Sequence, residues 1–243
     1  MHPYLTLRLP IIGINTGFSR PELELPAVTL RYTYVNATLR AGGVPLLLPP
    51  GGDADIVERM VDTCDGFIFT GGPDISAEWL GEELHTMASV MPPERESMDR
   101  TLMDAVIAAR KPLMGICLGC QEMNLLLGGT IIQDIYDEAP GGIQHTSKQA
   151  PFVTRHPASI EPDTLLNTIV KCETLEINSA HHQSIRQPGA NIRVSARAAD
   201  GIIEAVEMVD YPFGLGIQWH PEYLVDEAPH LALFEALVSA ARR

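Results

Sequence analysis

Short apolar runs alternate with longer segments of helical periodicity along the first half of the chain. A short run that ends at Gly, Pro, Asn or Cys is typical of a strand buried on both faces, whereas apolar residues three or four apart predict an amphipathic helix. The predicted strands are 11–15, 44–48, 66–70 and 112–116, and the predicted helices carry Val28, Tyr32, Val35 and Leu39, then Ile56, Val57 and Met60, then Met98, Leu102, Ala105, Val106 and Ala109. This alternation predicts a parallel sheet with helices on both faces.

The second half of the chain has shorter predicted strands and more loops. Strands are predicted at 175–178, 191–194, 202–208 and 214–219, and an apolar stripe predicts a last helix that carries residues 231–241. These strands need the same sheet for burial, so we interpret residues 1–243 as a single α/β domain with a β-rich addition. Two long polar stretches, 79–93 and 137–157, predict loops that wall a site.

Composition and charge exclude several kinds of protein. Hydrophobic residues make up 45% of the 243 positions and charged residues 20%, which is typical of a globular chain. The 17 Lys and Arg against 31 Asp and Glu give a net charge of −14, so we expect no nucleic-acid partner. No run approaches the roughly 18 apolar residues that cross a bilayer, and the N-terminus lacks the pattern of a signal peptide, so we expect a cytoplasmic location without a membrane role. The sequence leaves open whether the chain forms a homo-oligomer.

The cysteines are too few and too widely spread for a disulfide framework, so each one is either a buried packing residue or a reactive thiol. They are Cys64, Cys117, Cys120 and Cys172. Cys117 differs from the others because a buried strand precedes it, glycines flank it and an apolar helix follows. This arrangement is the thiol counterpart of the Gly-x-Ser-x-Gly nucleophile elbow. The helix N-terminus behind it favours a thiolate, so Cys117 is the candidate nucleophile.

Cys117 and Cys120 also form a C-x-x-C pair, which could belong to a redox site or to a zinc site. A zinc site needs two further ligands at suitable spacing, and Cys64 and Cys172 are isolated. A thioredoxin-type pair would follow the first strand and not the fourth. We therefore expect Cys120 to be a packing residue.

A nucleophilic thiol needs a base, and the base needs an acceptor that orients it. His220 and Glu222 follow a predicted buried strand and are two residues apart, so in an extended segment their side chains project to the same side. Glu222 can then fix the tautomer of His220. Four other histidines fall in predicted polar loops or at the start of the last helix and receive no function; they are His85, His145, His156 and His230.

Acyl chemistry at a thiol also needs hydrogen-bond donors for the oxyanion. The N–H of Leu118, at the predicted helix start, is one candidate. Gly72, in the stretch Thr-Gly-Gly-Pro-Asp after another strand, is the second, because glycine lets the backbone approach a ligand closely. A simple turn is the alternative interpretation of the second stretch.

Three stretches, GICLGCQ, TGGPDI and QWHPE, resemble the site motifs of class I glutamine amidotransferases and occur in that family's order. The resemblance covers nearly the whole chain and implies a flavodoxin-like three-layer sandwich with a mostly parallel central sheet. It implies that Cys117 is the nucleophile, His220 the general base and acid, and Glu222 the orienting carboxylate. It also implies that Gly72 and Leu118 form the oxyanion hole.

Further stretches, among them NSAHHQ and DGIIEA, are similar to one branch of this family, the peptidase C26-type γ-glutamyl hydrolases. Gln121 matches a family position that contacts the glutamyl substrate, and Ser179 and His181 are the other candidate substrate contacts. Bracing of the loop beside the site is the preferred role for His181 and His182 over direct catalysis. The chain departs from the branch at Leu118, where Arg is frequent, and at Glu96, where the branch has Asp.

The sequence therefore predicts a γ-glutamyl amide hydrolase that acts through a cysteine thioester on a small-molecule substrate. The resemblance implies γ-glutamyl-γ-aminobutyrate or a related γ-glutamyl amine as that substrate. We expect no metal and no organic cofactor in this reaction. Two alternatives stay open: the glutaminase subunit of a two-component amidotransferase, and a catalytically silent binding module.

Overall fold

The structure is a computed structural model that describes residues 8–20, 25–139, 142–146 and 154–242. Its helices are α1 (Tyr32–Arg40), α2 (Ala54–Thr63), α3 (Ala77–Leu80), α4 (Pro93–Ala108), α5 (Leu118–Leu126), α6 (Ile135–Glu138), α7 (Leu165–Val170) and α8 (Ala228–Ala240), with a 3₁₀ turn, η1 (Pro221–Tyr223). Its strands are β1 (Ile11–Asn15), β2 (Gly17–Ser19), β3 (Ala27–Thr29), β4 (Val44–Leu48), β5 (Gly66–Phe69), β6 (Leu113–Ile116), β7 (Thr130–Ile132), β8 (Arg155–Ile160), β9 (Thr174–Asn178), β10 (Ser184–Gln187), β11 (Ile192–Ala198), β12 (Ile203–Met208) and β13 (Gly214–Ile217).

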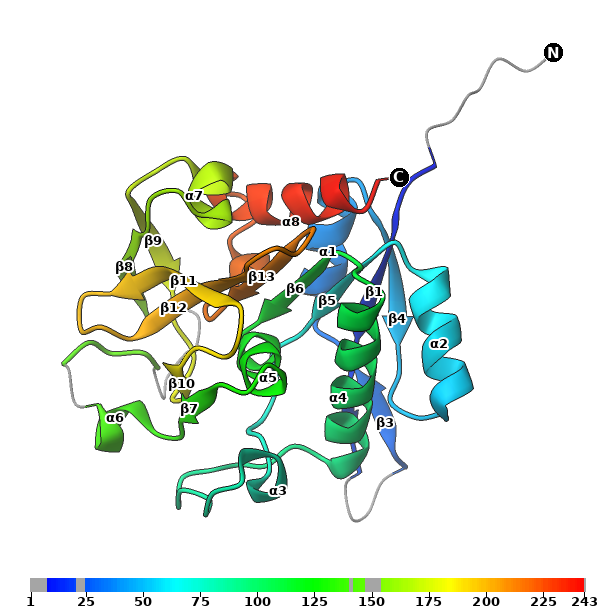
Figure 1. Cartoon of the computed structure of the whole chain (residues 1–243), viewed down its shortest axis with the longest axis horizontal. Helices are drawn as coiled ribbons and strands as arrows, with labels where there is room; N and C mark the ends of the chain where they lie inside the picture. Colours follow the sequence, from blue (N-terminus) through cyan, green and yellow to red (C-terminus); the bar gives the residue numbers. More distant parts are fainter. Residues whose placement is uncertain (1–7, 21–24, 140–141, 147–153, 243) are drawn as a thin grey trace.

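In the described part of the chain, nine strands form the central sheet, in the order β4-β1-β5-β6-β13-β12-β11-β8-β9. Neighbouring strands from β4 to β13 are parallel, and those from β13 to β9 are antiparallel. The sheet thus has a parallel half joined edge to edge with an antiparallel half (Figure 1). This confirms the predicted α/β fold with a β-rich addition.

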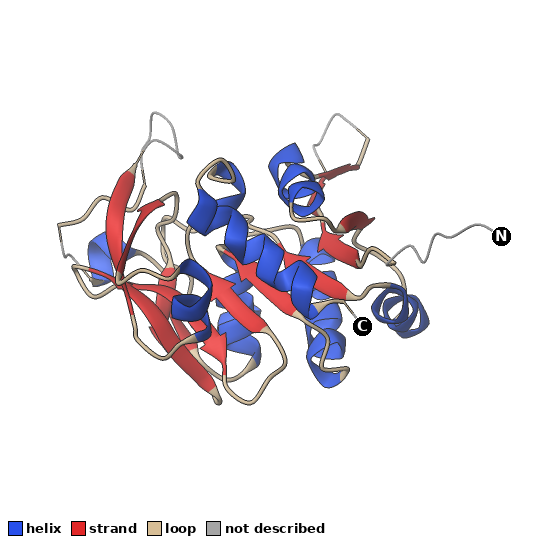
Figure 2. Ribbon diagram, turned by 90° about the horizontal axis from the view of Figure 1, so that it is seen from above, coloured by secondary structure: helices blue, strands red, loops and turns tan. Residues whose placement is uncertain are grey.

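Helices cover the two faces of this sheet in separate layers (Figure 2). On one face, α1 and α8 pack with α7, and Phe234 and Leu237 of α8 share a buried cluster with Ile12 of β1. On the other face, α2, α4 and α5 lie together, and Val57 and Leu102 share a second cluster with the strands. These two apolar layers make the predicted three-layer sandwich.

Strand β4 differs from its prediction as a strand buried on both faces. It lies at the edge of the sheet and pairs only with β1 among the described strands. Val44, Leu46 and Leu47 are therefore exposed, at 41%, 38% and 45%. A run of apolar letters does not reveal strand order, and an edge strand with an unpaired side can keep apolar residues in solvent.

The predicted first helix was wrong at its start and in its buried face. Val28 lies in β3, which pairs with β2 as a small antiparallel hairpin, and α1 begins only at Tyr32. Tyr32 and Leu39 of the predicted stripe are 71% and 51% exposed, whereas Tyr34 and Ala37 are buried. Tyr34 and Ala37 pack in the same buried cluster as Ile12 and Ile14 of β1, and the Tyr34 hydroxyl contacts the N–H of Gly71.

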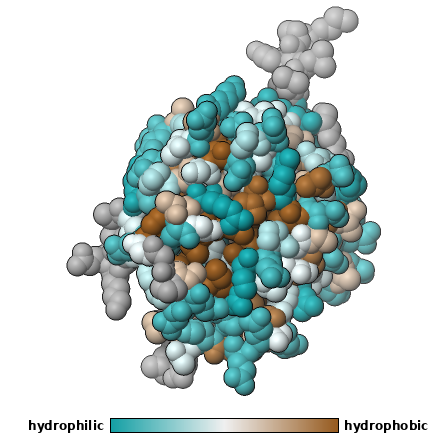
Figure 3. Space-filling view, turned by 60° about the vertical axis from the view of Figure 1, so that its left-hand side comes forward, coloured by the Kyte–Doolittle hydropathy of each residue, from teal (hydrophilic) through white to brown (hydrophobic). Residues whose placement is uncertain are grey.

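Several elements fall in stretches that the sequence pattern left as loops. The loop 79–93 begins inside α3, and the loop 137–157 overlaps the ends of α6 and β8, with part of it outside the described residues. Of the described helices, none is long and apolar enough to span a membrane. The face shown in Figure 3 is covered largely by hydrophilic residues, with smaller apolar areas near its middle.

Candidate active site

Cys117 lies in the turn between β6 and α5. Its backbone angles, φ 52° and ψ −103°, are a combination that residues other than glycine rarely adopt. A Cβ on Gly115 would lie 2.4 Å from the carbonyl oxygen of Gly119, and a Cβ on Gly119 would lie 2.4 Å from that of Phe69. Both flanking positions therefore require glycine, as expected for a nucleophile elbow.

Strand pairing brings His220 next to Cys117. β13 pairs in parallel with β6, and the N–H of Cys117 donates to the carbonyl of Ile217 over 2.7 Å. His220 follows β13, so both residues lie at the carboxyl edge of the parallel half, where α/β sheets place their ligands. The imidazole and the thiol are joined by a side-chain hydrogen bond.

Glu222 holds the other side of the imidazole. Its Oε1 lies 2.7 Å from Nδ1 of His220, and its side chain is fully buried. Burial alone would lower the pKa of His220, but the charges of Glu222 and Cys117 and their hydrogen bonds outweigh this effect and raise that pKa to about 10. The imidazole is thus protonated at neutral pH and forms an ion pair with Glu222.

Asn178, the last residue of β9, fixes the backbone of His220 from two sides. Its Nδ2 donates to the carbonyl of His220 over 3.0 Å, and the N–H of His220 donates to its Oδ1 over 3.0 Å. From the sequence, the 178–183 stretch was a candidate for polar contacts with substrate, and the contact of Asn178 with the His220 backbone was not predicted. The antiparallel half of the sheet therefore takes part in positioning the imidazole.

The Thr-Gly-Gly loop after β5 lies against the elbow. A Cβ on Gly71 would lie 2.8 Å from Cε1 of His220, and a Cβ on Gly72 would lie 2.8 Å from Cδ2 of Leu118. Because Leu118 is the first residue of α5, its N–H has no partner within the helix. The two N–H groups predicted to bind an oxyanion thus come from segments that touch beside Cys117.

Two residues that sequence reasoning missed hold this loop. The hydroxyl of Tyr34 accepts a hydrogen bond from the N–H of Gly71 over 3.0 Å, and Oδ1 of Asn15 accepts one from Thr70 over 2.6 Å. Burial and the charge of Glu222 raise the pKa of Tyr34, which keeps its hydroxyl protonated. The loop is therefore held by hydrogen bonds to Asn15 of β1 and to Tyr34 of α1.

A cavity of about 630 Å³ opens beside Cys117 and His220. One wall comes from the β2–β3 hairpin and the residue before α1, and includes Phe18, Thr29 and Arg31. Of the loop 79–93, which was a predicted wall, only Pro92 lines the cavity among the described residues. The hairpin was not predicted because its strands are three residues long.

Arg95 lines the cavity from α4 and is 2% exposed. Its Nε donates to the carboxylate of Asp99, and another guanidinium N–H donates to Oγ1 of Thr70 over 3.1 Å. Burial lowers the pKa of Arg95, but Asp99 outweighs this effect and raises it, so the cation stays charged. This buried pair supports the loop from the α4 side.

The predicted substrate contacts lie further from the cavity than expected. The described lining includes Ala180 but not Gln121, Ser179 or His181. Nε2 of Gln121 donates to Oε1 of Gln218 over 3.2 Å, and Nε2 of Gln218 lies 3.7 Å from Sγ of Cys117. Gln121 thus contacts the elbow through a second amide, and its contact with substrate stays a prediction.

Ser179 and His181 lie in the loop after β9, next to His145. The hydroxyl of Ser179 donates to the carbonyl of His145 over 2.8 Å, and both Ser179 and His181 are buried. Their predicted contact with substrate is likewise a prediction only. His182 lies between two carboxylates, 3.1 Å from Asp74 and 3.2 Å from Asp134, and thus braces the loops beside the site.

Comparisons with known proteins extend this picture. The family model for peptidase C26 matches residues 10–222. The chain belongs to the peptidase C26 family. It is 30% identical to a γ-glutamyl-γ-aminobutyrate hydrolase of Escherichia coli O157:H7, over 96% of this chain and 94% of that protein. These findings show a glutamine amidotransferase-like hydrolase.

Solved structures show that this C26 chain shares the fold of class I glutamine amidotransferases. The glutaminase domain of Trypanosoma brucei CTPS, with bound acivicin, matches with a TM-score of 0.63 at 15% identity, over 95% of this chain and 94% of that one. A glutamine amidotransferase from Methylobacillus flagellatus matches with a TM-score of 0.58 at 19% identity, over 90% and 74% of the two chains. At these identities the match concerns the fold alone.

Proposed function

We propose that this C26 protein is a cysteine-dependent γ-glutamyl hydrolase that releases glutamate and an amine. The observation that carries the proposal is the contact chain at the elbow, in which the Cys117 thiol bonds the His220 imidazole and Nδ1 of His220 lies 2.7 Å from Glu222. A thiol, an imidazole and a carboxylate in this order form an activated nucleophile. The E. coli relative is named for a reaction of this kind.

In the first half-reaction, the Cys117 thiolate forms a bond to the γ-carbonyl carbon of the substrate. The carbonyl oxygen becomes an oxyanion, which the N–H groups of Gly72 and Leu118 stabilise. As this intermediate collapses, the C–N bond breaks and His220 donates its proton to the departing nitrogen. The elevated pKa of His220 suits this role, because it supplies the proton at neutral pH.

In the second half-reaction, water attacks the γ-glutamyl thioester. The neutral His220 removes a proton from this water, and the same two N–H groups stabilise the second oxyanion. The C–S bond then breaks, glutamate leaves and the thiolate and the protonated imidazole are restored. No metal or organic cofactor takes part in these steps, and the two half-reactions give ping-pong kinetics.

The finer proposal is that the released amine carries a carboxylate, as γ-aminobutyrate does. Arg31 lines the same cavity as Cys117, and a guanidinium binds carboxylates with two parallel hydrogen bonds. The name of the E. coli relative points to the same substrate. Arg31→Gln is therefore expected to raise KM for γ-glutamyl-γ-aminobutyrate and to leave KM unchanged for a γ-glutamyl amine without a carboxylate.

The experiment measures glutamate release by the purified chain alone, from γ-glutamyl-γ-aminobutyrate and from glutamine in parallel. We expect rapid release from the first substrate, its loss in Cys117→Ala and its retention in Cys172→Ala. A folded Cys117→Ala protein with wild-type turnover would overturn the proposed nucleophile. The Cys172 variant is a matched control because that thiol is partly exposed and lies after α7.

The two alternatives predict different results in the same assay. A glutaminase subunit would release glutamate slowly from glutamine until a synthase partner is added. A silent binding module would release none from either substrate, and would not form a covalent γ-glutamyl adduct detectable by mass spectrometry.

A further inference from the structure

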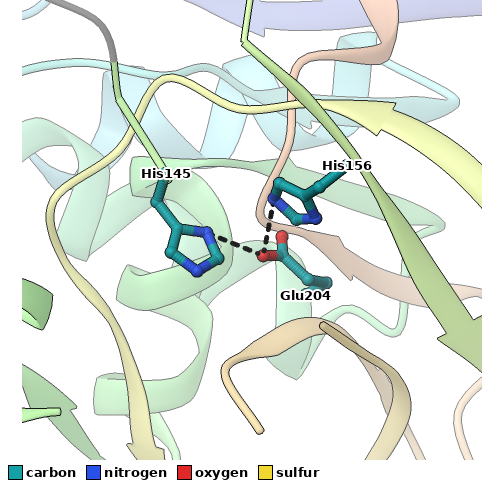
Figure 4. A group of neighbouring side chains, drawn as sticks. All are labelled: His145, His156 and Glu204. Atoms are coloured by element: carbon teal, nitrogen blue, oxygen red, sulfur yellow. Dashed lines mark ion pairs between the residues drawn. The ribbon is translucent and has the colours of Figure 1, made fainter. Parts of the chain in front are cut away.

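A second cluster of chemically capable side chains lies apart from the elbow, inside the antiparallel half. It consists of His145, His156, His181 and Glu204, which are 0%, 6%, 4% and 0% exposed. His156 lies on β8 and Glu204 on β12, whereas His145 and His181 lie in two different loops. Figure 4 shows the rings of His145 and His156 directed at the Glu204 carboxylate. His145 and His156 received no function from the sequence, and both were predicted to lie in polar loops; for His156, which lies on β8, this was wrong.

Three imidazole nitrogens converge on a single oxygen in this cluster. Oε1 of Glu204 lies 3.3 Å from Nδ1 of His145, 3.7 Å from Nε2 of His156 and 3.7 Å from Nε2 of His181. Zinc–ligand bonds of about 2.0–2.1 Å at tetrahedral angles separate neighbouring ligand atoms by about 3.3–3.4 Å. The three edges that meet at Glu204 Oε1 therefore lie within about half an ångström of those of a zinc tetrahedron, and the ligand atoms of His145, His156 and Glu204 all lie within 4.8 Å of one another.

The opposite nitrogen of each imidazole faces an acceptor. Nε2 of His145 lies 3.0 Å from Oδ2 of Asp200, Nδ1 of His181 lies 2.9 Å from the carbonyl oxygen of Gln183, and Nδ1 of His156 lies 3.3 Å from that of Pro157. Carboxylate and carbonyl oxygens cannot donate, so each of these outer nitrogens carries a proton. In a neutral imidazole, the other nitrogen, which faces Glu204 and which we call the inner nitrogen, then carries an unprotonated lone pair. Metal-binding histidines are oriented by outer partners of this kind.

Nδ1 of His145 lies 3.4 Å from the hydroxyl of Ser179 and 3.3 Å from Oε1 of Glu204, whereas the other inner atoms have no geometrically good hydrogen bond in the described part of the chain. Among the described residues, Nε2 of His156, Nε2 of His181 and both carboxylate oxygens of Glu204 are buried and have no hydrogen-bond partner. Inner lone pairs that face a carboxylate repel it unless a proton or a metal cation lies between them, and Glu204 and Asp200 raise the pKa of His145 against the effect of burial. A divalent cation would also neutralise the two buried carboxylates, Glu204 and Asp200, without a protonated imidazole.

We propose that His145, His156 and Glu204, whose ligand atoms all lie within 4.8 Å of one another, bind one zinc ion, and that the ring of His181 moves in to supply the fourth ligand of a closed structural site. Three imidazoles and a carboxylate fill the four tetrahedral positions, so no position is left for a substrate. The ion would tie the segment 142–146 and the loop after β9 to strands β8 and β12. The site is separate from the proposed hydrolysis and does not depend on it.

The experiment measures zinc binding by untagged full-length protein that also carries Cys117→Ser, which removes the elbow thiol as a competing zinc ligand. After dialysis against a chelator, zinc alone is added back and bound metal is counted by mass spectrometry of the native protein. We expect one zinc ion per chain and a rise in Tm on its addition. A protein that takes up no zinc under these conditions would overturn the proposal.

Variants locate the ion and separate it from surface binding. His156→Gln is expected to abolish zinc uptake and the rise in Tm, whereas His85→Gln, at a histidine that pairs with exposed Asp137, should change neither. Asp200→Asn keeps all four ligands but is expected to weaken zinc binding by about 10–100-fold. Equal zinc affinity in wild type and in His156→Gln would contradict the proposal.

A spectroscopic measurement needs no variant at the cluster and so avoids any loss of folding. Cobalt(II) added to the same chelator-treated Cys117→Ser protein should give the intense visible bands of tetrahedral cobalt. Zinc should then bleach these bands as it displaces cobalt. The weak bands of octahedral cobalt would instead indicate adventitious surface binding and count against the site.

Discussion

The hydroxyl of Tyr34 links two parts of the proposed catalytic site, because it accepts a 3.0 Å hydrogen bond from the N–H of Gly71 and interacts with the carboxylate of Glu222. Loss of this hydroxyl should loosen both the Thr-Gly-Gly loop after β5 and the carboxylate of Glu222. We expect Tyr34→Phe to lower kcat by about 10–100-fold with little change in KM, since one preorganised interaction is removed. A Tm within a few degrees of wild type would show that the fold is intact, and an unchanged kcat would contradict the role.

A second prediction concerns the space between Gly71 and His220. A Cβ on residue 71 would lie 2.8 Å from Cε1 of His220, closer than carbon atoms approach in proteins. Gly71→Ala should therefore push the imidazole away from its thiol and lower kcat/KM by about 100-fold. The measurement is steady-state release of glutamate at saturating and limiting substrate. Wild-type kinetics would show that the imidazole has room to move.

The pKa of about 10 at His220 gives the protein a distinct pH dependence. The leaving amine needs the protonated imidazole, so kcat/KM should fall as pH rises through about 10. Because the unfolded-state pKa is about 6.5, protonation of His220 also stabilises the fold fully below about pH 6.5, and this stabilisation is lost as pH rises through the folded value. Glu222→Gln removes the largest raising charge and should shift the alkaline limb of kcat/KM to lower pH. An alkaline limb at the same pH in both proteins would contradict the assignment.

His182 provides a further stability prediction. Its hydrogen bonds to Asp74 raise its pKa against the opposing effect of burial, and Asp134 contributes in the same direction. This stabilisation is complete below the unfolded pKa of about 6.5 and is lost as pH rises through the raised folded pKa. His182→Gln should therefore lower Tm by about 2–4 °C at pH 6 and by less at pH 9.

Protonation of Asp134 at low pH removes the stabilisation that its contact with His182 gives the fold. Burial would raise the pKa of Asp134, but the His182 contact and two backbone N–H groups outweigh it and lower that pKa. Its contribution is present above the unfolded pKa of about 3.9 and is lost as pH falls through the lowered folded value. His85→Gln is the matched control, because its partner Asp137 is largely exposed and such pairs contribute little. An equal loss of Tm in both variants at pH 6 would count against the bracing role.

Local patterns predicted the parts of the molecule that depend on local chemistry. Cys117 stands at a glycine-flanked strand end and His220 with Glu222 at another, so each could be recognised within a few residues. Strand order then brought them together, because β6 and β13 are neighbours in the sheet. To place these motifs side by side, the prediction thus needed only the rule that the carboxyl ends of parallel strands lie at the same edge of the sheet.

The parts that were missed depend on contacts between distant segments. Tyr34 was overlooked because the apolar stripe through Tyr32 and Leu39 suggested a different buried face for α1. His145 and His156 looked unremarkable in polar surroundings, and only antiparallel pairing of β8 with β11, and of β11 with β12, brings His156 near Glu204. A sequence pattern registers periodicity along one segment and contains no information about such cross-sheet neighbours.

The positive φ of Cys117 destabilises the folded protein at the same position that supplies the proposed nucleophile. A residue other than glycine held at φ 52° raises the free energy of the folded state by about 1–3 kcal/mol. Alanine or serine in its place would remove the sulfur and keep this strain, whereas glycine would remove both. Cys117→Gly should consequently be inactive yet unfold at a higher temperature than wild type, which makes it the variant of choice for trapping intact substrate in the cavity.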